Sequence, residues 1–211
     1  MKLSNQRTRI CKKCFKEINE ATIHNLLYKN VDLCHDCLIE LSPVLNEFKI
    51  GDVDAMNIYW YNEKIQEILY QFKGCKDIEL KNTFFDYYYD WLNIKFKKYT
   101  IIPAPSTKDN DQERGFNQVL EMCENFKMPM MCIVHKLGNE LQHNLNSKDR
   151  AKISNSMIID DVDLSRKKIL IVDDVYTTGS TVKSMIELIK EKNPKKIKVL
   201  VMAKTLDLDS R

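Results

Sequence analysis

The chain has 211 residues, 44% of them hydrophobic, which suits one sizeable α/β core with a small appendage better than two full domains. Its first residues lack an apolar signal region, and its longest purely aliphatic run, 169–172, is too short to cross a bilayer. We therefore expect a cytoplasmic protein with no transmembrane segment. The net charge of +3 permits contact with phosphates or nucleic acid and argues for neither.

Two Cys-x-x-Cys pairs stand near the N-terminus, Cys11 with Cys14 and Cys34 with Cys37, separated by 19 residues. This spacing is typical of a treble-clef or ribbon-type zinc site, whereas disulfides are rare in a reducing cytosol. Four thiolates leave no open position for catalysis, and two pairs in one short segment favour metal over a redox Cys-x-x-Cys. We predict a structural Zn²⁺ that stabilises a module of residues 1–43.

The remaining cysteines and two histidines have simpler interpretations. His24 and His35 could each replace a ligand, although a lone histidine is more often a surface or packing residue. Cys75, Cys123 and Cys132 lie on apolar segments or at their ends, so we interpret them as small buried hydrophobes.

Residues 44–211 are predicted to form the main domain, which starts with two helices. The first covers about 60–72 and ends before Gly74, and the second covers about 77–94. Their apolar positions at helical spacing are Tyr61, Ile65, Ile68, Leu69 and Phe72 in the first, and Phe84, Phe85, Tyr88, Trp91 and Leu92 in the second. For the aromatic cluster of the second, a core-facing helix or a lid is favoured over a base-stacking platform.

Strands and helices then alternate. The predicted strands are 100–102, 130–134, 169–172 and 197–202, with a polar loop at 138–150. The predicted helices are one from Gly115 and one at 180–192. The residues expected to be buried in the first of these helices are Phe116, Val119, Leu120, Cys123 and Phe126. Such alternation indicates a parallel sheet with right-handed crossovers. We therefore predict an α/β fold in which helices flank a parallel sheet.

The segment 169–181 joins a buried strand, two carboxylates and a loop of small hydroxyl residues. Ligands of parallel sheets sit outside the carboxyl ends of the strands, and the next helix offers unpaired N–H groups to an anion. The loop is therefore expected to cradle a 5′-phosphate, with Gly179 allowing close approach or a positive φ. The cradle residues are Thr177, Thr178, Gly179, Ser180 and Thr181.

Asp173 and Asp174 stand directly before this loop. Facing a phosphate they would repel it, so they are expected to accept hydrogen bonds from ribose hydroxyls. The alternative is an acidic turn that caps an ordinary helix with Thr178 or Ser180. The whole pattern favours a ligand site, and no Walker pattern competes with it.

This string resembles the phosphoribosyl-pyrophosphate signature of type I phosphoribosyltransferases. The resemblance implies their fold and a ligand bound with Mg²⁺, in a reaction that displaces pyrophosphate through an oxocarbenium-like transition state. It implies catalytic as well as binding roles for Asp173 and Asp174. Arg114, at an expected helix start, is the candidate for meeting pyrophosphate. The alternative for Arg114 is a solvated helix-start residue.

The order of these features is similar to that of the ComF family: a four-cysteine module, a Pro-x-Pro segment at 103–105, the string Arg-Gly-Phe-Asn-Gln at 114–118 and the phosphoribosyltransferase loop. The family pattern of Gln, Leu, Arg and Asn is matched loosely by Gln142, Leu145, Arg150 and Asn155. The resemblance implies a bacterial protein of DNA uptake in natural transformation, working beside the helicase-like ATPase ComFA, with single-stranded DNA as a candidate partner.

Two other functions remain open on the sequence. The first is a metabolic phosphoribosyltransferase that transfers phosphoribose to a nucleobase. The second is a non-catalytic adaptor that binds phosphoribosyl pyrophosphate or DNA. The sequence identifies no base-reading pocket, so it does not name an acceptor.

Overall fold

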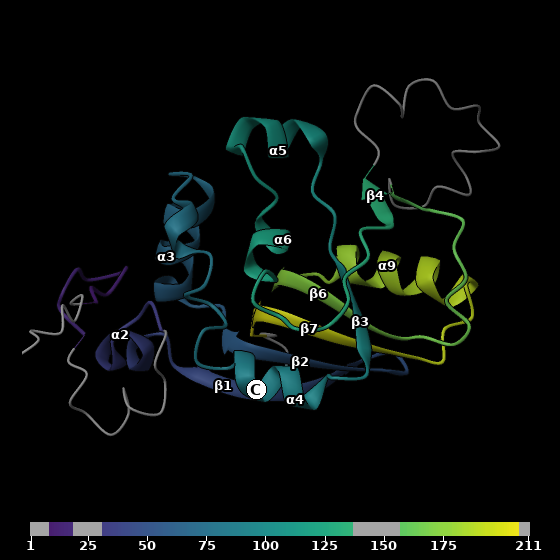
Figure 1. Cartoon of the computed structure of the whole chain (residues 1–211), viewed down its shortest axis with the longest axis horizontal. Helices are drawn as coiled ribbons and strands as arrows, with labels where there is room; N and C mark the ends of the chain where they lie inside the picture. The colour runs from purple at the N-terminus through teal and green to yellow at the C-terminus, as the bar shows by residue number, and fades with distance from the viewer. Residues whose placement is uncertain (1–8, 19–30, 137–156, 207–211) are drawn as a thin grey trace, which may run out of the picture.

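The computed structural model describes residues 9–18, 31–136 and 157–206 (Figure 1). Its main sheet has five strands in the order β1-β2-β7-β6-β3. The strands are β1 (Pro43–Ile50), β2 (Val53–Trp60), β3 (Tyr99–Pro103), β6 (Lys168–Tyr176) and β7 (Lys196–Lys204). Strands β2, β7, β6 and β3 are parallel, and β1 pairs antiparallel at the edge. The predicted α/β fold with a mostly parallel sheet is therefore confirmed.

The helices are α2 (His35–Glu40), α3 (Glu63–Lys73), the 3-10 turn η1 (Ile78–Leu80), α4 (Tyr89–Lys95), α5 (Lys108–Arg114), α6 (Gln118–Met122) and α9 (Ser180–Glu191). Figure 1 shows α3, α5 and α6 above the main sheet in this view, with α6 next to β6. Two short strands, β4 (Val134–Lys136) and β5 (Met157–Ile159), form a separate antiparallel pair. No helix of the described residues is long and apolar enough to cross a membrane.

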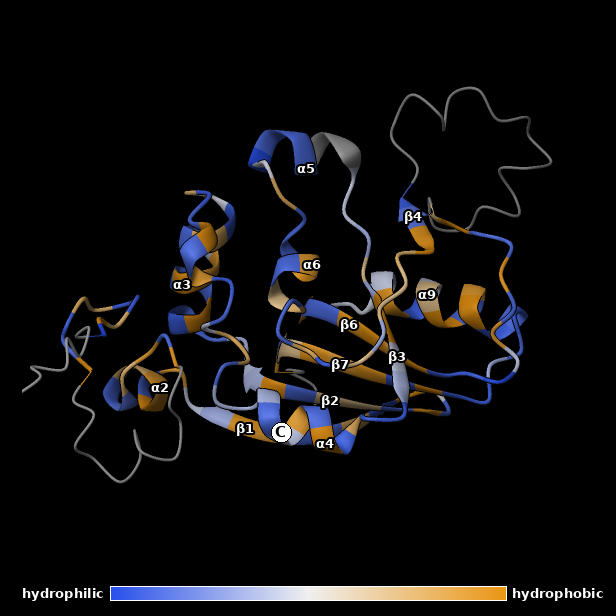
Figure 2. Ribbon diagram, in the orientation of Figure 1, coloured by the Kyte–Doolittle hydropathy of each residue, from blue (hydrophilic) through white to orange (hydrophobic). Residues whose placement is uncertain are grey.

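The core lies on the central strands. Figure 2 shows β6 and β7 as largely hydrophobic and the coloured part of α5 as hydrophilic. Four consecutive residues of β6, 169–172, are fully buried, which agrees with the predicted strand. Helix α9 buries Val182, Met185, Ile186 and Ile189 at helical spacing, and the predicted helix at 180–192 is confirmed.

The hairpin of β1 and β2 was not predicted. Its turn at Gly51, where φ is +60°, joins β1 to β2. On the edge strand β1, less exposed and more exposed residues alternate from Asn46 to Ile50. The edge strand β1 is irregular: its register shifts between Pro43 and Asn46, and Leu45 has a φ of +48°. The predicted helix at 60–72 begins later, at Glu63, because Asn62 caps it by accepting from Ile65 N at 2.9 Å.

The predicted long helix at 77–94 is wrong. Only η1 and α4 are helical there, and turns connect them. Phe84, Phe85, Tyr87 and Tyr89 are all buried, and such closely spaced residues cannot share one face of a helix. Their burial agrees with a core role for the cluster, although Trp91 is 41% exposed.

Two further predictions need correction. Instead of one helix from Gly115, the chain forms α5 and α6, separated by Gly115 with a φ of +85°. The strand predicted at 130–134 is reduced to one parallel bridge, Ile101 with Met130, before β4 starts at Val134. Pro129 has no N–H to donate, which limits pairing here. The predicted loop at 138–150 lies outside the described residues.

Candidate functional site

The acidic pair lies within β6, because this strand continues to Tyr176 beyond its predicted end. Successive side chains of a strand point to opposite faces. Asp174 faces α3 and α6, where its Oδ2 accepts from Lys73 Nζ and, at 2.7 Å, from Gln118 Nε2. Its Oδ1 accepts from Val175 N at 2.5 Å. The carboxylate of Asp174 is thus held by donors from three segments.

Asp173 is buried and has a different electrostatic setting. Its Oδ1 accepts from Asp174 N at 2.9 Å. Burial, and then the charge of Asp174, raise the pKa of Asp173 to about 8, against the opposing effects of the Asp174 N–H, Lys73 and Lys136. Burial and the neighbouring Asp174 charge therefore favour the protonated form of Asp173, and a carboxyl whose pKa is raised in this way is common at functional sites.

The phosphate loop follows β6 and leads into α9. Gly179 is the N-cap of α9 with a φ of +72°, so the predicted positive φ is confirmed. A Cβ there would lie 2.3 Å from the ring of Tyr176, so glycine is also required for space. Thr178 Oγ1 accepts from Ser180 N at 3.4 Å, a long contact that leaves the start of α9 without a side-chain cap. Thr177, Thr178 and Ser180 are exposed, as a site for an external anion requires.

A cleft of about 900 Å³ opens beside the acidic pair. Its walls come from α3, from the end of α5 and from the start of the phosphate loop, with Lys73, Arg114, Val175 and Thr177 among the lining residues. Residues that are far apart in sequence therefore meet at the carboxyl end of β6, where ligands of parallel sheets bind. No motif in the sequence points to Lys73, which α3 brings to Asp174.

Arg114 is not at a helix start, so this part of the prediction is wrong. It is the last residue of α5, and a guanidinium at that end meets the carbonyl groups rather than the N–H groups of the helix. Its Nη1 donates to Gln118 Oε1 at 2.6 Å. Gln118 donates in turn to Asp174, so Arg114 reaches the acidic pair through one intervening side chain.

The string 114–118 has a structural reason at each position. Gly115 takes a left-handed conformation that separates the two helices. Phe116 packs on Phe72 of α3, with ring centroids 5.2 Å apart. Asn117 caps α6 by accepting from Leu120 N at 3.0 Å. The string therefore attaches α6 to α3 and directs Gln118 towards β6.

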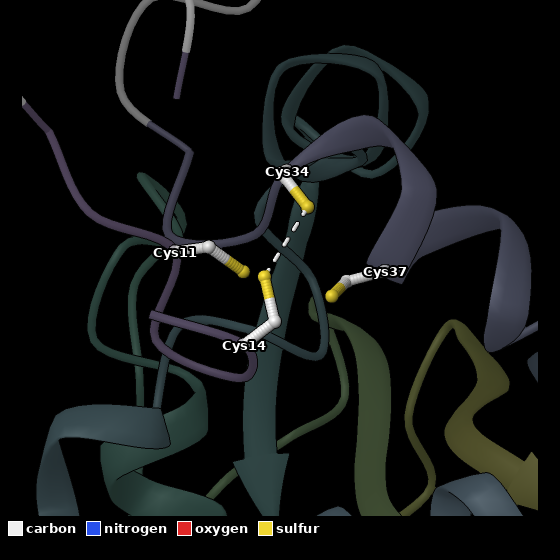
Figure 3. A group of neighbouring side chains, drawn as sticks. All are labelled: Cys11, Cys14, Cys34 and Cys37. Atoms are coloured by element: carbon white, nitrogen blue, oxygen red, sulfur yellow. Dashed lines mark hydrogen bonds between the residues drawn. The ribbon is translucent and has the colours of Figure 1, made fainter. Parts of the chain in front are cut away.

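The four paired cysteines gather at one point, as Figure 3 shows. Their Sγ atoms all lie within 4.8 Å of one another, and Cys14 Sγ is 3.8 Å from Cys34 Sγ. Thiolates at about 2.3 Å from a tetrahedral zinc ion lie about 3.8 Å apart, so the cluster fits Zn²⁺. Burial raises the pKa of Cys11, but the backbone N–H groups of Cys34, Cys14 and Lys13 outweigh it and bring this pKa to about 7.

The remaining cysteines and histidines fit the predictions in part. Cys123 is buried as expected, whereas Cys75 and Cys132 are exposed, so their interpretation as buried hydrophobes is wrong. Both follow turns or irregular segments rather than a packed face. His35 is exposed and is not part of the cysteine cluster. His24 lies outside the described residues, as do Gln142, Leu145, Arg150 and Asn155.

The segments that carry the paired cysteines contact residues 79–87 through polar groups. Tyr87 Oη donates to Leu33 O at 2.7 Å, and Asp32 N donates to Asp86. Lys12 Nζ pairs with Glu79 at 2.5 Å. The cysteine cluster is therefore attached to the segment that carries the buried aromatic residues.

A domain model matches the C-terminal part of the chain, whereas two curated proteins match most of it. The model of the phosphoribosyl transferase domain matches residues 134–208, which include the acidic pair and the loop. The competence protein ComFC of Streptococcus pneumoniae is 25% identical over 206 residues, which cover 96% of this chain and 90% of that protein. The chain is therefore similar to ComFC over nearly its whole length. ComFC of Bacillus subtilis is 27% identical over 164 residues, covering 76% of this chain and 67% of that protein.

The similarity of this chain to solved phosphoribosyltransferases is weak. A purine phosphoribosyltransferase from Pyrococcus horikoshii is 21% identical, with a TM-score of 0.33 over 55% of this chain and 68% of that chain. A hypoxanthine phosphoribosyltransferase from Staphylococcus aureus is 12% identical, with a TM-score of 0.39 over 64% and 71%. Both TM-scores are low, so the fold is shown by the strand order of the main sheet and by the domain model that matches residues 134–208.

Proposed function

We propose that this chain binds phosphoribosyl pyrophosphate with Mg²⁺ at the carboxyl end of β6 and serves DNA uptake in natural transformation. The observation that carries the ligand is the junction of β6 and α9. There the two carboxylates are followed by a loop whose glycine is required both for its φ and for space. The similarity to ComFC over most of the chain supports the role in competence.

Each part of the site has a separate task in this proposal. The N–H groups and hydroxyls of residues 177–181 bind the 5′-phosphate. Asp173 and Asp174 accept from the ribose hydroxyls, and hydrogen bonds of this kind are stronger when the carboxyl group is ionised. Lys73 and Arg114 line the cleft into which the pyrophosphate end extends.

The magnesium ion would arrive with the ligand. Asp174 is already engaged by Lys73 and Gln118, and Asp173 is buried, so phosphate oxygens of the ligand supply most of the donors that the ion needs. Bound there, Mg²⁺ neutralises charge on the pyrophosphate. The cysteine cluster holds a structural Zn²⁺ in a module of residues 1–43, which we propose as a unit distinct from residues 44–211.

Calorimetric titration with phosphoribosyl pyrophosphate and Mg²⁺ tests the ligand. We expect binding to the wild-type chain and its loss in Asp173→Asn with Asp174→Asn, because asparagine has one neutral acceptor oxygen where a carboxylate has two charged ones, and each lost hydrogen bond to a charged group costs about 1.5 to 3 kcal/mol. The control replaces Asp52 and Asp54 by asparagine, at the opposite end of the sheet, and should bind normally. Unchanged affinity in a folded Asp173, Asp174 double variant would contradict the ligand assignment.

A gene deletion tests the cellular role. We expect loss of transformation with exogenous DNA and normal growth on purine or pyrimidine bases as the nucleobase source. The wild-type gene should restore transformation, and the Asp173→Asn, Asp174→Asn gene should not. Normal transformation with defective base salvage would instead indicate the alternative, a metabolic phosphoribosyltransferase that acts on a nucleobase.

The same deletion strain addresses partners and mechanism. We propose that the protein works in the cytoplasm beside a ComFA-like helicase ATPase, with single-stranded DNA as a second candidate partner. A chain that binds phosphoribosyl pyrophosphate, restores transformation and releases no pyrophosphate with any nucleobase would favour the non-catalytic adaptor.

A further inference from the structure

Two side chains from different helices meet on one oxygen of Asp174. Lys73 is the last residue of α3, and Gln118 is the first residue of α6. Both donate to Oδ2, Lys73 as an ammonium and Gln118 through Nε2 at 2.7 Å. The Lys73 and Asp174 side chains are only 24% and 10% exposed, so water screens this contact weakly. The contact joins residues 101 positions apart in sequence.

Gln118 is itself held from the other side. Its Oε1 accepts from Arg114 Nη1 at 2.6 Å, while its Nε2 faces Asp174. This fixes the orientation of the amide, because reversing it would set the NH₂ group against the guanidinium and the oxygen against the carboxylate. Arg114 is therefore linked to Asp174 through Gln118.

The arrangement restricts how Asp174 can meet a ligand. A carboxylate offers about four acceptor positions. Val175 N takes one on Oδ1, and Lys73 and Gln118 take those on Oδ2. Three donors from separate segments hold the group in one orientation, which leaves the second position of Oδ1 for a hydroxyl of the ligand. Binding to a carboxylate that is already oriented avoids the entropic cost of ordering it.

We infer that Lys73 and Gln118 are positioning residues that orient the Asp174 carboxylate for the ribose hydroxyls, with Arg114 supporting Gln118. The inference rests on the proposed function, since it assumes that Asp174 contacts the sugar. The Arg-Gly-Phe-Asn-Gln string at 114–118 then has the task of orienting Asp174 through Gln118 of α6. Lys73, which lies outside both motifs, also becomes part of the site.

The test measures affinity for phosphoribosyl pyrophosphate with Mg²⁺ in single and double variants. Gln118→Met changes no charge and should weaken binding about tenfold to 100-fold, the effect of losing a hydrogen bond to a charged group. Lys73→Met should weaken it by a similar factor, and Lys73→Arg should restore most of the affinity. The double variant should lose less than the product of the two factors, because both residues act through the same oxygen.

Matched controls come from exposed residues of α3 that do not line the cleft. Lys64→Met removes the same charge from an exposed residue that pairs with Glu67, and Gln71→Met makes the same neutral exchange. Both should bind like the wild type. Thermal unfolding of every variant identifies any that fails to fold. If Lys73→Met does not fold, Lys73→Arg replaces it and should bind with near-normal affinity. If Gln118→Met does not fold, Gln118→Asn replaces it and should show an intermediate loss of affinity.

The possible results separate the inference from the proposed function. A wild-type chain that does not bind the ligand overturns the proposed function. Wild-type binding with folded Gln118→Met and Lys73→Met variants of normal affinity overturns the inference alone. If the affinity loss of the double variant equals the product of the two single losses, the two residues act independently and the inference is overturned. An equal loss of affinity in Lys64→Met also overturns it, since that would show a general effect of charge.

Discussion

Replacing Cys11 and Cys34 by serine together is expected to remove the zinc and unfold the N-terminal module. Each Cys-x-x-Cys pair would lose one thiolate, and no tetrahedral set of four remains. Zinc supplies about 10 to 16 kcal/mol of apparent binding free energy in small zinc-finger peptides, and that energy is folding energy. Metal analysis should give one zinc per wild-type chain and almost none in the variant.

The control for this experiment uses the exposed cysteines. Replacing Cys75 and Cys132 by serine should leave the zinc content unchanged, because both are exposed and lie outside the cluster. Hydrogen exchange should show lost protection in the module of the Cys11, Cys34 variant, including at the amide of Lys12, which donates to Asp32 O at 2.8 Å. Zinc retained by this variant, or a metal-free wild-type module with full protection, would contradict the prediction.

Replacing Asp173 by asparagine is expected to stabilise the fold while weakening ligand binding. The pKa of Asp173 is raised from 3.8 to about 8, chiefly by burial. Between these two pH values the folded chain keeps a proton that the unfolded chain has lost. Stability therefore falls as pH rises from about 4 to about 8, and asparagine removes this loss. Its side-chain oxygen can still accept from Asp174 N.

The gain should depend on pH in a way that identifies its cause. It should be near zero below about pH 4 and greatest above about pH 8, on the order of 2 to 5 kcal/mol since one pKa unit equals about 1.4 kcal/mol. Urea unfolding at pH 4 and pH 8.5 measures it. Asp163→Asn should show no gain, because Asp163 is exposed and its pKa is lowered by hydrogen bonds with Ser165. A stability difference that is constant across pH would disprove the proposed protonation of Asp173.

The sequence predicted best what is local along the chain. The buried strand, the two carboxylates, the glycine with positive φ and α9 follow one another without a gap, so each supports the interpretation of the next. The cysteine cluster was predictable for a similar reason, since tight spacing within each pair leaves few arrangements for four ligands. The residues assigned to the ligand remain predictions that the titration decides.

Contacts between distant segments could not be predicted. Lys73 meets Asp174 only because α3 folds over the end of the sheet, and nothing near Lys73 in sequence indicates this. Arg114 was misplaced because Gly115 fits either the start of a helix or a break between two, and only its φ of +85° decides. The aromatic cluster at 84–89 was assigned to a helix because turns have no periodic signal. The hairpin at Gly51 did carry a signal, alternation around a Gly-Asp turn, that could have found it.

The irregular edge of the main sheet has a consequence for self-association. An edge strand offers unpaired backbone groups to which a second chain can add. Here the register shift between Pro43 and Asn46 twists the first part of β1, and the charged residues Glu47 and Lys49 follow it on an exposed strand. Proline, a bulge and charge are the features by which natural sheets resist edge-to-edge aggregation. This edge is therefore built to keep the sheet from extending into fibres.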